Sequence, residues 1–305
     1  MKQEIRIGSR GSALALWQAE WVKARLHHFW PALAIEIVII KTSGDKIQDV
    51  SLSTIGGKGL FVKEIEEALL ADAIDLAVHS MKDVPAELPD GLIISAVPER
   101  EDPRDVLITK HGETLAELPA GTRVGTSSLR RQALLLALNP GLRVEMLRGN
   151  VDTRLRKQRE GVVDATVLAA AGLKRLGIVP EHSCVLDDQE FLPAIGQGAL
   201  GIETRREEAV IDLVYPLHHK DTALTVAAER AFLRRIGGSC RTPLAAKGTV
   251  NGAMVHLRAL IASPDGKQVI RGERSGPSGE TEQLGCALAE TLLALGGKEI
   301  LARLF

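Results

Sequence analysis

Short apolar runs alternate with longer amphipathic segments along the first half of this 305-residue chain. Residues 4–7 and 35–40 predict strands, and the β-branched residues of the second run predict a strand buried on both faces. Between them, residues 13–29 carry apolar side chains near helical spacing. A polar, glycine-rich loop over 43–59, a helix over 61–71 and a strand over 74–78 follow. This alternation predicts an α/β fold with a parallel or mixed sheet that has helices on its faces.

The same order of elements recurs further along the chain. The pattern predicts a strand over 122–125, a helix over 129–138, a strand over 142–147, a helix over 151–160 and a strand over 165–169. In both halves an aspartate leads the last strand, Asp75 in the first and Asp164 in the second. We therefore expect two similar α/β domains rather than one large sheet.

Two segments rich in helix and strand breakers, residues 98–103 and 193–198, resemble hinges. Two crossings between two α/β domains predict a cleft, as in ligand-binding clamshells. From about residue 222 the composition changes, and a helix over 223–236, two or three strands within 248–274 and a helix over 280–295 predict a smaller α+β domain. The expected domains are residues 1–98 with 198–217, residues 103–193, and residues 221–305.

Charge and composition exclude several classes of protein. The formal net charge is −1 and aromatic residues make up 3% of the chain, so a nucleic-acid binder lacks both its basic excess and its stacking surface. The N-terminus lacks the apolar run of a secretory signal, and no segment approaches the ~20 apolar residues of a membrane helix. Three widely spaced cysteines do not form a disulfide framework or a zinc site. We expect a cytoplasmic protein that binds any anionic ligand through local arginines.

Arginines stand beside two of the expected helix N-termini. Arg10 and Ser12 precede the first helix, and Arg130 and Arg131 follow Thr126-Ser127-Ser128 in the first turn of another. A helix N-terminus favours an anion, and a guanidinium binds a carboxylate through two hydrogen bonds. Because cations there oppose the helix dipole, the second pair indicates a bound anion. In the alternative interpretation Ser12 only caps its helix and Arg10 is a solvated charge.

Arg148 follows an expected buried strand and so emerges at its carboxyl end, where α/β sheets bind ligands. Gly149-Asn150 then leads into a helix that carries Arg154 and Arg156. The alternative, an ion-paired surface helix, suits Arg156 and Arg159 better.

Polar residues also follow the strand over 74–78, from His79 to Pro85. Asp83, among cations, has the chemistry to stabilise a developing positive charge or to relay a proton, although it would equally pair with Lys82 or cap a turn. We expect His79 to be structural, because no second metal ligand stands at helical spacing. Residues 56–59 lack the spacing of a phosphate-binding P-loop, which leaves a mobile loop that presents Lys58.

One cysteine has the context of a functional residue. Two glycines and Pro243 surround Cys240 on a loop, and Arg241 beside it favours the thiolate. By contrast, Cys286 lies in an apolar helical stripe and Cys184 has no supporting neighbours.

These clusters, in this order, are similar to those of the porphobilinogen deaminase family, and the resemblance covers nearly the whole chain. The matching strings are Arg10-Gly11-Ser12 with LALWQA (14–19), GGKGLFV (56–62), AVHSMKDVP (77–85), REDPRD (100–105), GTSSLRRQ (125–132), LRGN (147–150), LPAIGQG (192–198), Ala228-Glu229-Arg230 and Cys240.

The resemblance implies a three-domain monomer whose first two domains are like periplasmic-type anion-binding clamshells. It implies a dipyrromethane cofactor, made from two substrate molecules and joined to Cys240 by a thioether, and it implies no metal. The family adds four porphobilinogen units to this primer with loss of ammonia, then releases hydroxymethylbilane by hydrolysis. Every pyrrole carries an acetate and a propionate, which gives the arginines a purpose.

The resemblance also implies roles for single residues. Asp83 matches the catalytic carboxylate, and it binds the cofactor together with Cys240, Ser80, Lys82, Ser128, Arg130 and Arg131. The substrate-binding positions are Arg10, Ser12, Lys58, Phe61, Thr126, Ser127, Arg148, Arg154 and Gln197. Two departures from the family pattern are Thr54, where many relatives carry lysine, and the Gly-Gly-Ser and Arg-Thr-Pro that flank Cys240.

Two other functions compete with this one. A non-enzymatic organic-anion receptor on the same clamshell explains the arginines, but it gives no role to Cys240 or Asp83. An enzyme with a thiol nucleophile predicts a free Cys240 with a histidine base beside it, and the sequence offers no obvious base.

Overall fold

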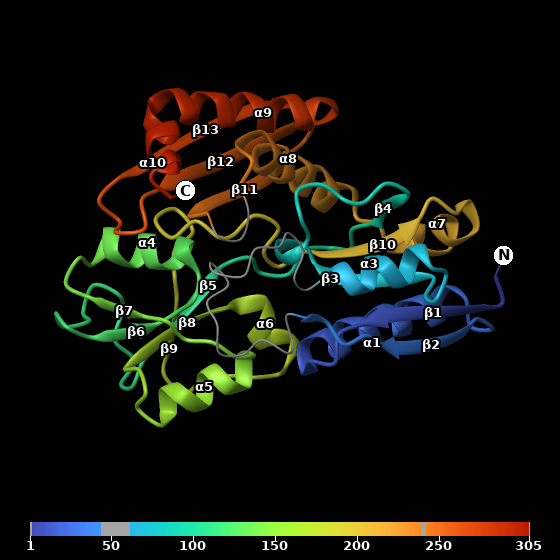
Figure 1. Cartoon of the computed structure of the whole chain (residues 1–305), viewed down its shortest axis with the longest axis horizontal. Coiled ribbons are helices and arrows are strands. Elements are labelled where there is room, and N and C mark those ends of the chain that lie inside the picture. The colour runs from blue at the N-terminus through green and yellow to red at the C-terminus, as the bar shows by residue number, and fades with distance from the viewer. Residues whose placement is uncertain (1, 44–61, 239–241, 305) are drawn as a thin grey trace. The chain divides into compact units, whose positions relative to one another are not determined.

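The computed structural model describes residues 2–43, 62–238 and 242–304, which divide into two compact units (Figure 1). Unit 1 comprises the chain up to Glu101 together with Ala199–Ala223, and unit 2 comprises Asp102–Gly198 together with the chain from Leu224 onward. The first two boundaries between the units fall within, or at the end of, the two breaker-rich segments of the sequence.

Unit 1 is built on a five-stranded mixed sheet in the order β2-β1-β3-β10-β4. Strand β1 pairs parallel with β2 and β3, whereas β10 runs antiparallel to β3 and β4. Its described elements are β1 (Glu4–Ser9), α1 (Ala13–Phe29), β2 (Ala34–Ile39), α3 (Lys63–Leu70), β3 (Leu76–Ser80), η1 (Met81–Asp83), β4 (Leu92–Ala96), β10 (Leu200–Arg205), α7 (Glu208–Val214) and η2 (Tyr215–Leu217).

Helix α1 buries one face against this sheet. Ala19, Val22 and Leu26 are fully buried at helical spacing, in the same core cluster as Ile5 and Ile7 of β1. The residue bounds of this helix are those that the sequence predicted.

The prediction of a strand buried on both faces at residues 35–40 is wrong. Strand β2 is the edge of its sheet, and only Ile35 of its six residues is buried, while Ile39 is 56% exposed. Glu36 lies within this strand and is exposed, which agrees with an edge position.

Unit 2 repeats the arrangement with a second five-stranded mixed sheet, in the order β7-β6-β8-β5-β9. Strand β6 pairs parallel with β7 and β8, and β5 runs antiparallel to β8 and β9. Its elements are β5 (Asp105–Ile108), β6 (Arg123–Gly125), α4 (Leu129–Leu138), β7 (Arg143–Glu145), α5 (Val151–Arg159), β8 (Ala165–Ala169), α6 (Ala170–Arg175) and β9 (Ser183–Val185).

An Arg–Asp pair recurs at the same place in both sheets. The backbone N–H of Arg6 donates to Oδ2 of Asp75 at 2.7 Å, and its Nε donates to the same atom at 3.0 Å. In unit 2, Arg123 donates to Asp164 through the same two groups, at 2.8 and 3.1 Å. The aspartates that lead the last strands thus fasten equivalent strand pairs, and the prediction of two similar mixed α/β sheets is confirmed.

The C-terminal part of unit 2 is a three-stranded antiparallel sheet in the order β11-β12-β13. Its elements are α8 (Lys220–Ile236), β11 (Leu244–Asn251), β12 (Met254–Ala262), β13 (Val269–Pro277), η3 (Ser278–Glu280), α9 (Thr281–Leu292), a π-helical turn (Leu293–Gly297) and α10 (Lys298–Ala302). The predicted smaller α+β region is therefore confirmed.

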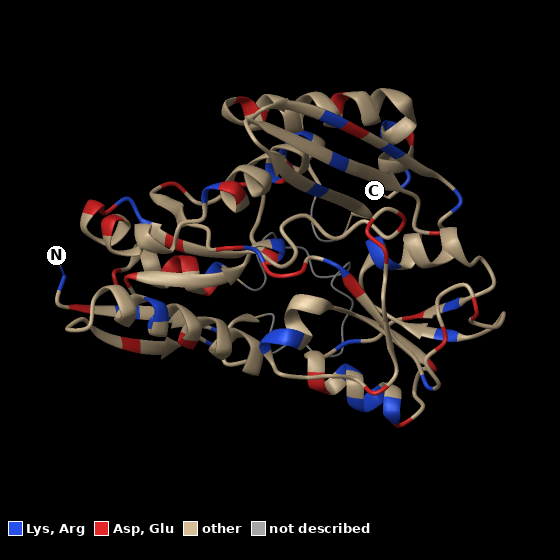
Figure 2. Ribbon diagram, turned by 180° about the vertical axis from the view of Figure 1, so that it is seen from behind, with Lys and Arg blue, Asp and Glu red and all other residues tan. Residues whose placement is uncertain are grey.

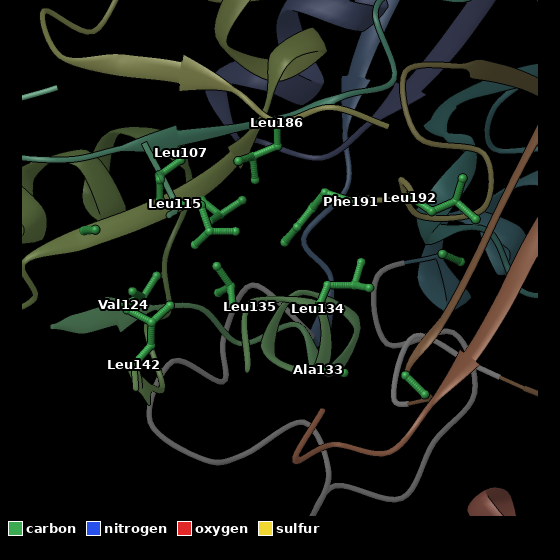
Figure 3. Packing of buried hydrophobic residues seen from close by; sticks show 14 of the residues in the cluster. Leu107, Leu115, Val124, Ala133, Leu134, Leu135, Leu142, Leu186, Phe191 and Leu192 are labelled. Atoms are coloured by element: carbon green, nitrogen blue, oxygen red, sulfur yellow. The ribbon is translucent and has the colours of Figure 1, made fainter. Parts of the chain in front are cut away.

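Residues of β11 and β12 share a core with helix α4. Ala245 and Leu260 belong to the same buried cluster as Leu134 and Leu135. Figure 3 shows Leu134 and Leu135 on the side of α4 that faces Leu115 and Phe191. This core fixes α4, the helix whose first turn carries Arg130 and Arg131.

Candidate functional site

A hollow opens in unit 1 at the carboxyl ends of β1 and β3. The chain leaves β1 through Arg10 to Ser12 and enters α1, and it leaves β3 through Ser80 into the short helix η1. Parallel strands end at the same edge of a sheet, so these two turns meet there. The hollow is lined by Arg10, Ser12, Leu14, Ala15, Gln18, Val62, Ile65, Val78, His79, Ser80 and Asp83.

Four of the predicted site residues meet in this hollow: Arg10, Ser12, Ser80 and Asp83. Ser12 caps α1, since its Oγ accepts a hydrogen bond from the N–H of Ala15 at 3.3 Å. The capping interpretation of Ser12 is therefore confirmed, and this residue also lines the hollow. Asp83 is exposed to solvent.

Gln18 was not among the predicted site residues. It lies on the buried face of α1, is 2% exposed, and donates through Nε2 to Oγ of Ser80 at 2.9 Å. This bond ties helix α1 to the end of β3 and orients the Ser80 hydroxyl. A polar residue on the apolar stripe of a helix was the signal that would have identified it.

His79, which lines the hollow, is one of three buried titratable groups that interact with one another. His79 and Glu203 are 5% and 0% exposed, and Nε2 of His79 lies 2.8 Å from Oε2 of Glu203. Glu66 of α3 is 8% exposed. Burial, together with the negative charge of Glu203, raises the pKa of Glu66 to about 7, although the charge of His79 opposes the shift.

In unit 2 the predicted pair Arg130 and Arg131 is buried around one carboxylate. Nη2 of Arg130 lies 2.8 Å from Oδ2 of Asp105, and Nη2 of Arg131 lies 2.8 Å from Oδ1. Burial alone would raise the pKa of Asp105, but the charges of the two arginines outweigh it and hold this pKa at about 2. Two cations in the first turn of a helix predict a bound anion, and the carboxylate of Asp105 is one such anion.

Gln197 joins the same network. It is 1% exposed, and its Nε2 donates to Oδ1 of Asp105 at 3.0 Å and to the carbonyl of Pro103 at 2.7 Å. Arg130 also donates to the carbonyl of Leu192 at 2.9 Å, and its guanidinium carbon lies 5.8 Å from the ring centre of Phe191. The network therefore holds both breaker-rich segments on β5 and α4.

The three hydroxyl residues before α4 make local bonds. Ser128 caps the helix by accepting from the N–H of Arg131 at 3.4 Å, and Ser127 donates to the carbonyl of Leu147 at 2.6 Å. Thr126 is buried, and its Oγ1 accepts from the N–H of Ser128 at 3.2 Å. Gly125 is required beside them, because a Cβ there would lie 2.9 Å from that of Leu147.

Arg148 does not follow a buried strand as predicted. Strand β7 is the edge of its sheet and already ends at Glu145, so Arg148 stands in the loop before α5. Arg154 donates from Nε to the carbonyl of Gly149 at 2.8 Å. Figure 2 shows lysines and arginines gathered along α5, and among them Arg156 pairs with Glu160 at 2.8 Å, as the surface-helix interpretation predicted.

Positive charge exceeds negative charge around Asp105. Two buried guanidinium groups face one carboxylate, and within the described residues Nε of Arg130 has no hydrogen-bond partner. Nε of Arg148 is also buried without a partner there. An unpaired buried donor of this kind is costly.

Cys240, Lys58 and Phe61 lie outside the described residues, as does Thr54. Lys82 is half-buried, and it is not among the residues that line the hollow.

Comparison with known proteins identifies the family. Residues 5–212 match the family model "Porphobilinogen deaminase, dipyromethane cofactor binding domain", and residues 223–294 match the model of the C-terminal domain of the same enzyme. The chain belongs to the porphobilinogen deaminase family. The resemblance stated from the sequence motifs is thereby confirmed, and the first of these regions is a dipyrromethane cofactor-binding domain.

Relatives in this family match over nearly their full length. The porphobilinogen deaminase of Syntrophotalea carbinolica is 55% identical over 301 residues, which is 98% of this chain and 96% of that protein. The porphobilinogen deaminase of Geobacter metallireducens is 53% identical over 304 residues, which is 99% of this chain and 95% of that protein.

Among solved structures, the periplasmic aliphatic sulphonate binding protein of Escherichia coli covers 77% of this chain and 70% of its own, at 17% identity and a TM-score of 0.40. Within the described ranges, no helix has the length and apolar character to cross a membrane.

Proposed function

We propose that this protein is a hydroxymethylbilane synthase that condenses four porphobilinogen molecules on a dipyrromethane primer held by Cys240. One observation carries the proposal: an exposed carboxylate, Asp83, lines the same hollow as the guanidinium of Arg10. A pyrrole of this substrate class presents an N–H donor on its ring and carboxylates on its side chains. A carboxylate acceptor and a cation in one hollow suit both features.

Each residue of the hollow then has a task. Asp83 accepts a hydrogen bond from a pyrrole N–H and stabilises the positive charge that develops as ammonia leaves. Arg10 binds a side-chain carboxylate, and the N-terminus of α1, capped by Ser12, adds its dipole. Ser80, oriented by Gln18, supplies a hydroxyl donor.

The dipyrromethane, when bound, supplies the pyrrole carbon to which the chain of pyrroles is attached. Arg130, Arg131, Ser128, Lys82 and Ser80 bind its carboxylates in this proposal, and Asp83 accepts from its N–H groups. Arg148, Arg154, Thr126, Ser127, Gln197, Lys58 and Phe61 complete the substrate-binding set.

The proposal extends to the organisation of the protein. We propose three domains, residues 1–98 with 198–217, residues 103–193 and residues 221–305, in a cytoplasmic monomer. A hydrophobic cluster that runs from Phe232 through Leu257 to Leu288, and that also includes Ile195, supports the third domain.

The direct experiment measures stoichiometry. Purified protein is supplied with porphobilinogen, and both free ammonia and the linear tetrapyrrole are quantified by mass spectrometry. Four ammonia per hydroxymethylbilane is the expected ratio. Tight binding of porphobilinogen with no ammonia released would instead favour the organic-anion receptor.

A further inference from the structure

The roles proposed above leave Glu66, His79 and Glu203 without a task. They come from three elements, α3, β3 and β10, and they are at most 8% exposed. A hydrogen bond of 2.8 Å joins His79 to Glu203, and the charges of His79 and Glu203 both act on Glu66. Groups of this kind are costly to bury, so their presence in the interior of unit 1 requires an explanation.

The cluster contains more acceptors than donors. Within the described residues, Oε1 of Glu66 and Oε1 of Glu203 are buried and have no hydrogen-bond partner. With both carboxyl groups ionised and His79 protonated, the cluster has a net charge of −1. One more proton brings this charge to zero, which is the less costly state in a poorly solvated interior.

The charges around the cluster do not favour the release of this proton. Glu67, the next residue on α3, is exposed and raises the pKa of Glu66 slightly further. The nearest strand arginines are held elsewhere: Arg6 binds Asp75 and Arg205 binds the carbonyls of Leu69 and Ile74. Strand β4, which also packs on α3, contains no titratable residue over Leu92–Ala96.

The cluster is connected to the hollow through His79. This residue lines the hollow together with Asp83 and Arg10, and in β3 it directly precedes Ser80. With Nε2 engaged by Glu203, the ring orientation is fixed, and strand β3 is tied to β10 beside the segment that carries Asp83.

We propose that Glu66, His79 and Glu203 form a proton-sharing cluster that positions the end of β3 and sets the charge beneath the hollow that Asp83 lines. The proposal rests on the function proposed above, in which the substrate in that hollow carries the amino group that leaves as ammonia. When the cluster carries its extra negative charge, it favours the protonated form of this amino group in the hollow. When the proton is bound to the cluster, this contribution is lost, so binding of the substrate through its ammonium group strengthens with pH through the ionisation of the cluster.

The first test needs neither a variant nor activity. Infrared spectra of the whole protein, with glutamate labelled at the carboxyl carbon, are recorded from pH 5 to pH 9. We expect the band of a buried protonated glutamic acid that disappears around pH 7. Its absence across this range would overturn the proposal.

The second test asks whether Glu66 binds that proton. Histidine ring signals are followed by NMR over the same pH range in the wild type, in Glu66→Gln and in Glu67→Gln as the matched exposed control. The signal of His79 should show an inflection near pH 7 in the wild type and in Glu67→Gln, and this inflection should be absent in Glu66→Gln. The same inflection in all three proteins would show that Glu66 is not coupled to His79.

The third test connects the cluster to the reaction. At pH 8, kcat/KM of Glu66→Gln should fall about fivefold below that of the wild type, while at pH 6 the two should agree, because glutamine mimics the protonated acid. An equal loss at both pH values would show a purely structural role. A wild type that releases no ammonia would refute the proposed function and leave the infrared and NMR results unaffected.

Discussion

Arg130 and Asp105 form an ion pair in the interior of unit 2, with 2.8 Å between Nη2 and Oδ2, and Arg131 shares the same carboxylate. Two cations on one acid leave a surplus positive charge in a buried place. The carbonyls of Leu192 and Val167 offset part of this charge. The pair therefore has a structural role in unit 2, and the binding role of Arg130 is the one that we propose above.

Replacement of the shared carboxylate tests the structural role. Asp105→Asn leaves two buried guanidinium groups without a counter-charge, and the free energy of unfolding should fall by about 3–5 kcal/mol. The control is Glu160→Gln, which breaks the exposed pair with Arg156 and should cost no more than ~0.5 kcal/mol. Urea unfolding of both variants gives the comparison, and equal losses would mean that Asp105 is not the centre of the network.

Arg130→Leu should weaken binding and leave the fold intact, whereas Asp105→Asn should destabilise the fold. Arg131 still neutralises Asp105 through Nε and Nη2, at 3.2 and 2.8 Å, so the chain should remain folded. Primer assembly or substrate capture should weaken, and KM for porphobilinogen should rise about tenfold or more with the loss of a charged contact. Far-UV circular dichroism and steady-state kinetics on one preparation measure the two effects. Unchanged kinetics would remove Arg130 from the binding set.

Asp83→Asn separates catalysis from attachment of the primer. The side chain lies on an exposed turn, so the variant should fold and still gain the mass of two linked pyrroles. Turnover should fall by about 100-fold or more, because the charge that stabilises the developing cation is removed. Glu87→Gln, also exposed and four residues further on, is the control and should keep its rate. Normal turnover in Asp83→Asn would refute the catalytic assignment.

The raised pKa of Glu66 makes stability depend on pH in a defined direction. The pKa is about 7 in the folded chain against a usual 4.5, so the unfolded chain loses this proton first as pH rises. The stability that Glu66 contributes is therefore fully present below about pH 4.5 and is lost as pH rises to 7.

Glu66→Gln removes this dependence. Between pH 5 and pH 8 the wild type should lose about 2 kcal/mol more unfolding free energy than the variant. Denaturant unfolding at both pH values measures the difference, and parallel curves for the two proteins would contradict the pKa assigned to Glu66.

Local patterns located most of the fold. Helical spacing and a serine cap located α1 and α4 with their observed bounds, because these signals lie within the segments themselves. The antiparallel strands β5 and β10 were not predicted. Each follows a crossing between the two units directly, and its place in a sheet depends on partners distant in the chain, such as Gly201 opposite His79.

Sequence patterns located the candidate site residues only where the signal was local as well. The arginines near Asp105 were found, since cations in a first helical turn are a local anomaly. Their carboxylate partner was missed, because Asp105 lies 25 residues before Arg130 and in an unpredicted strand. Glu203, the partner of His79, was missed for the same reason, because it lies 124 residues further along the chain in an unpredicted strand.

The proposed function requires that Cys240 carry a dipyrromethane primer from which porphobilinogen is polymerised. Intact-mass analysis of the purified protein, followed by peptide mapping around Cys240, detects this primer. We expect a peptide containing Cys240 that is heavier by two linked pyrroles, either as isolated or after incubation with porphobilinogen. A Cys240 peptide that is still unmodified after that incubation would refute the proposed function.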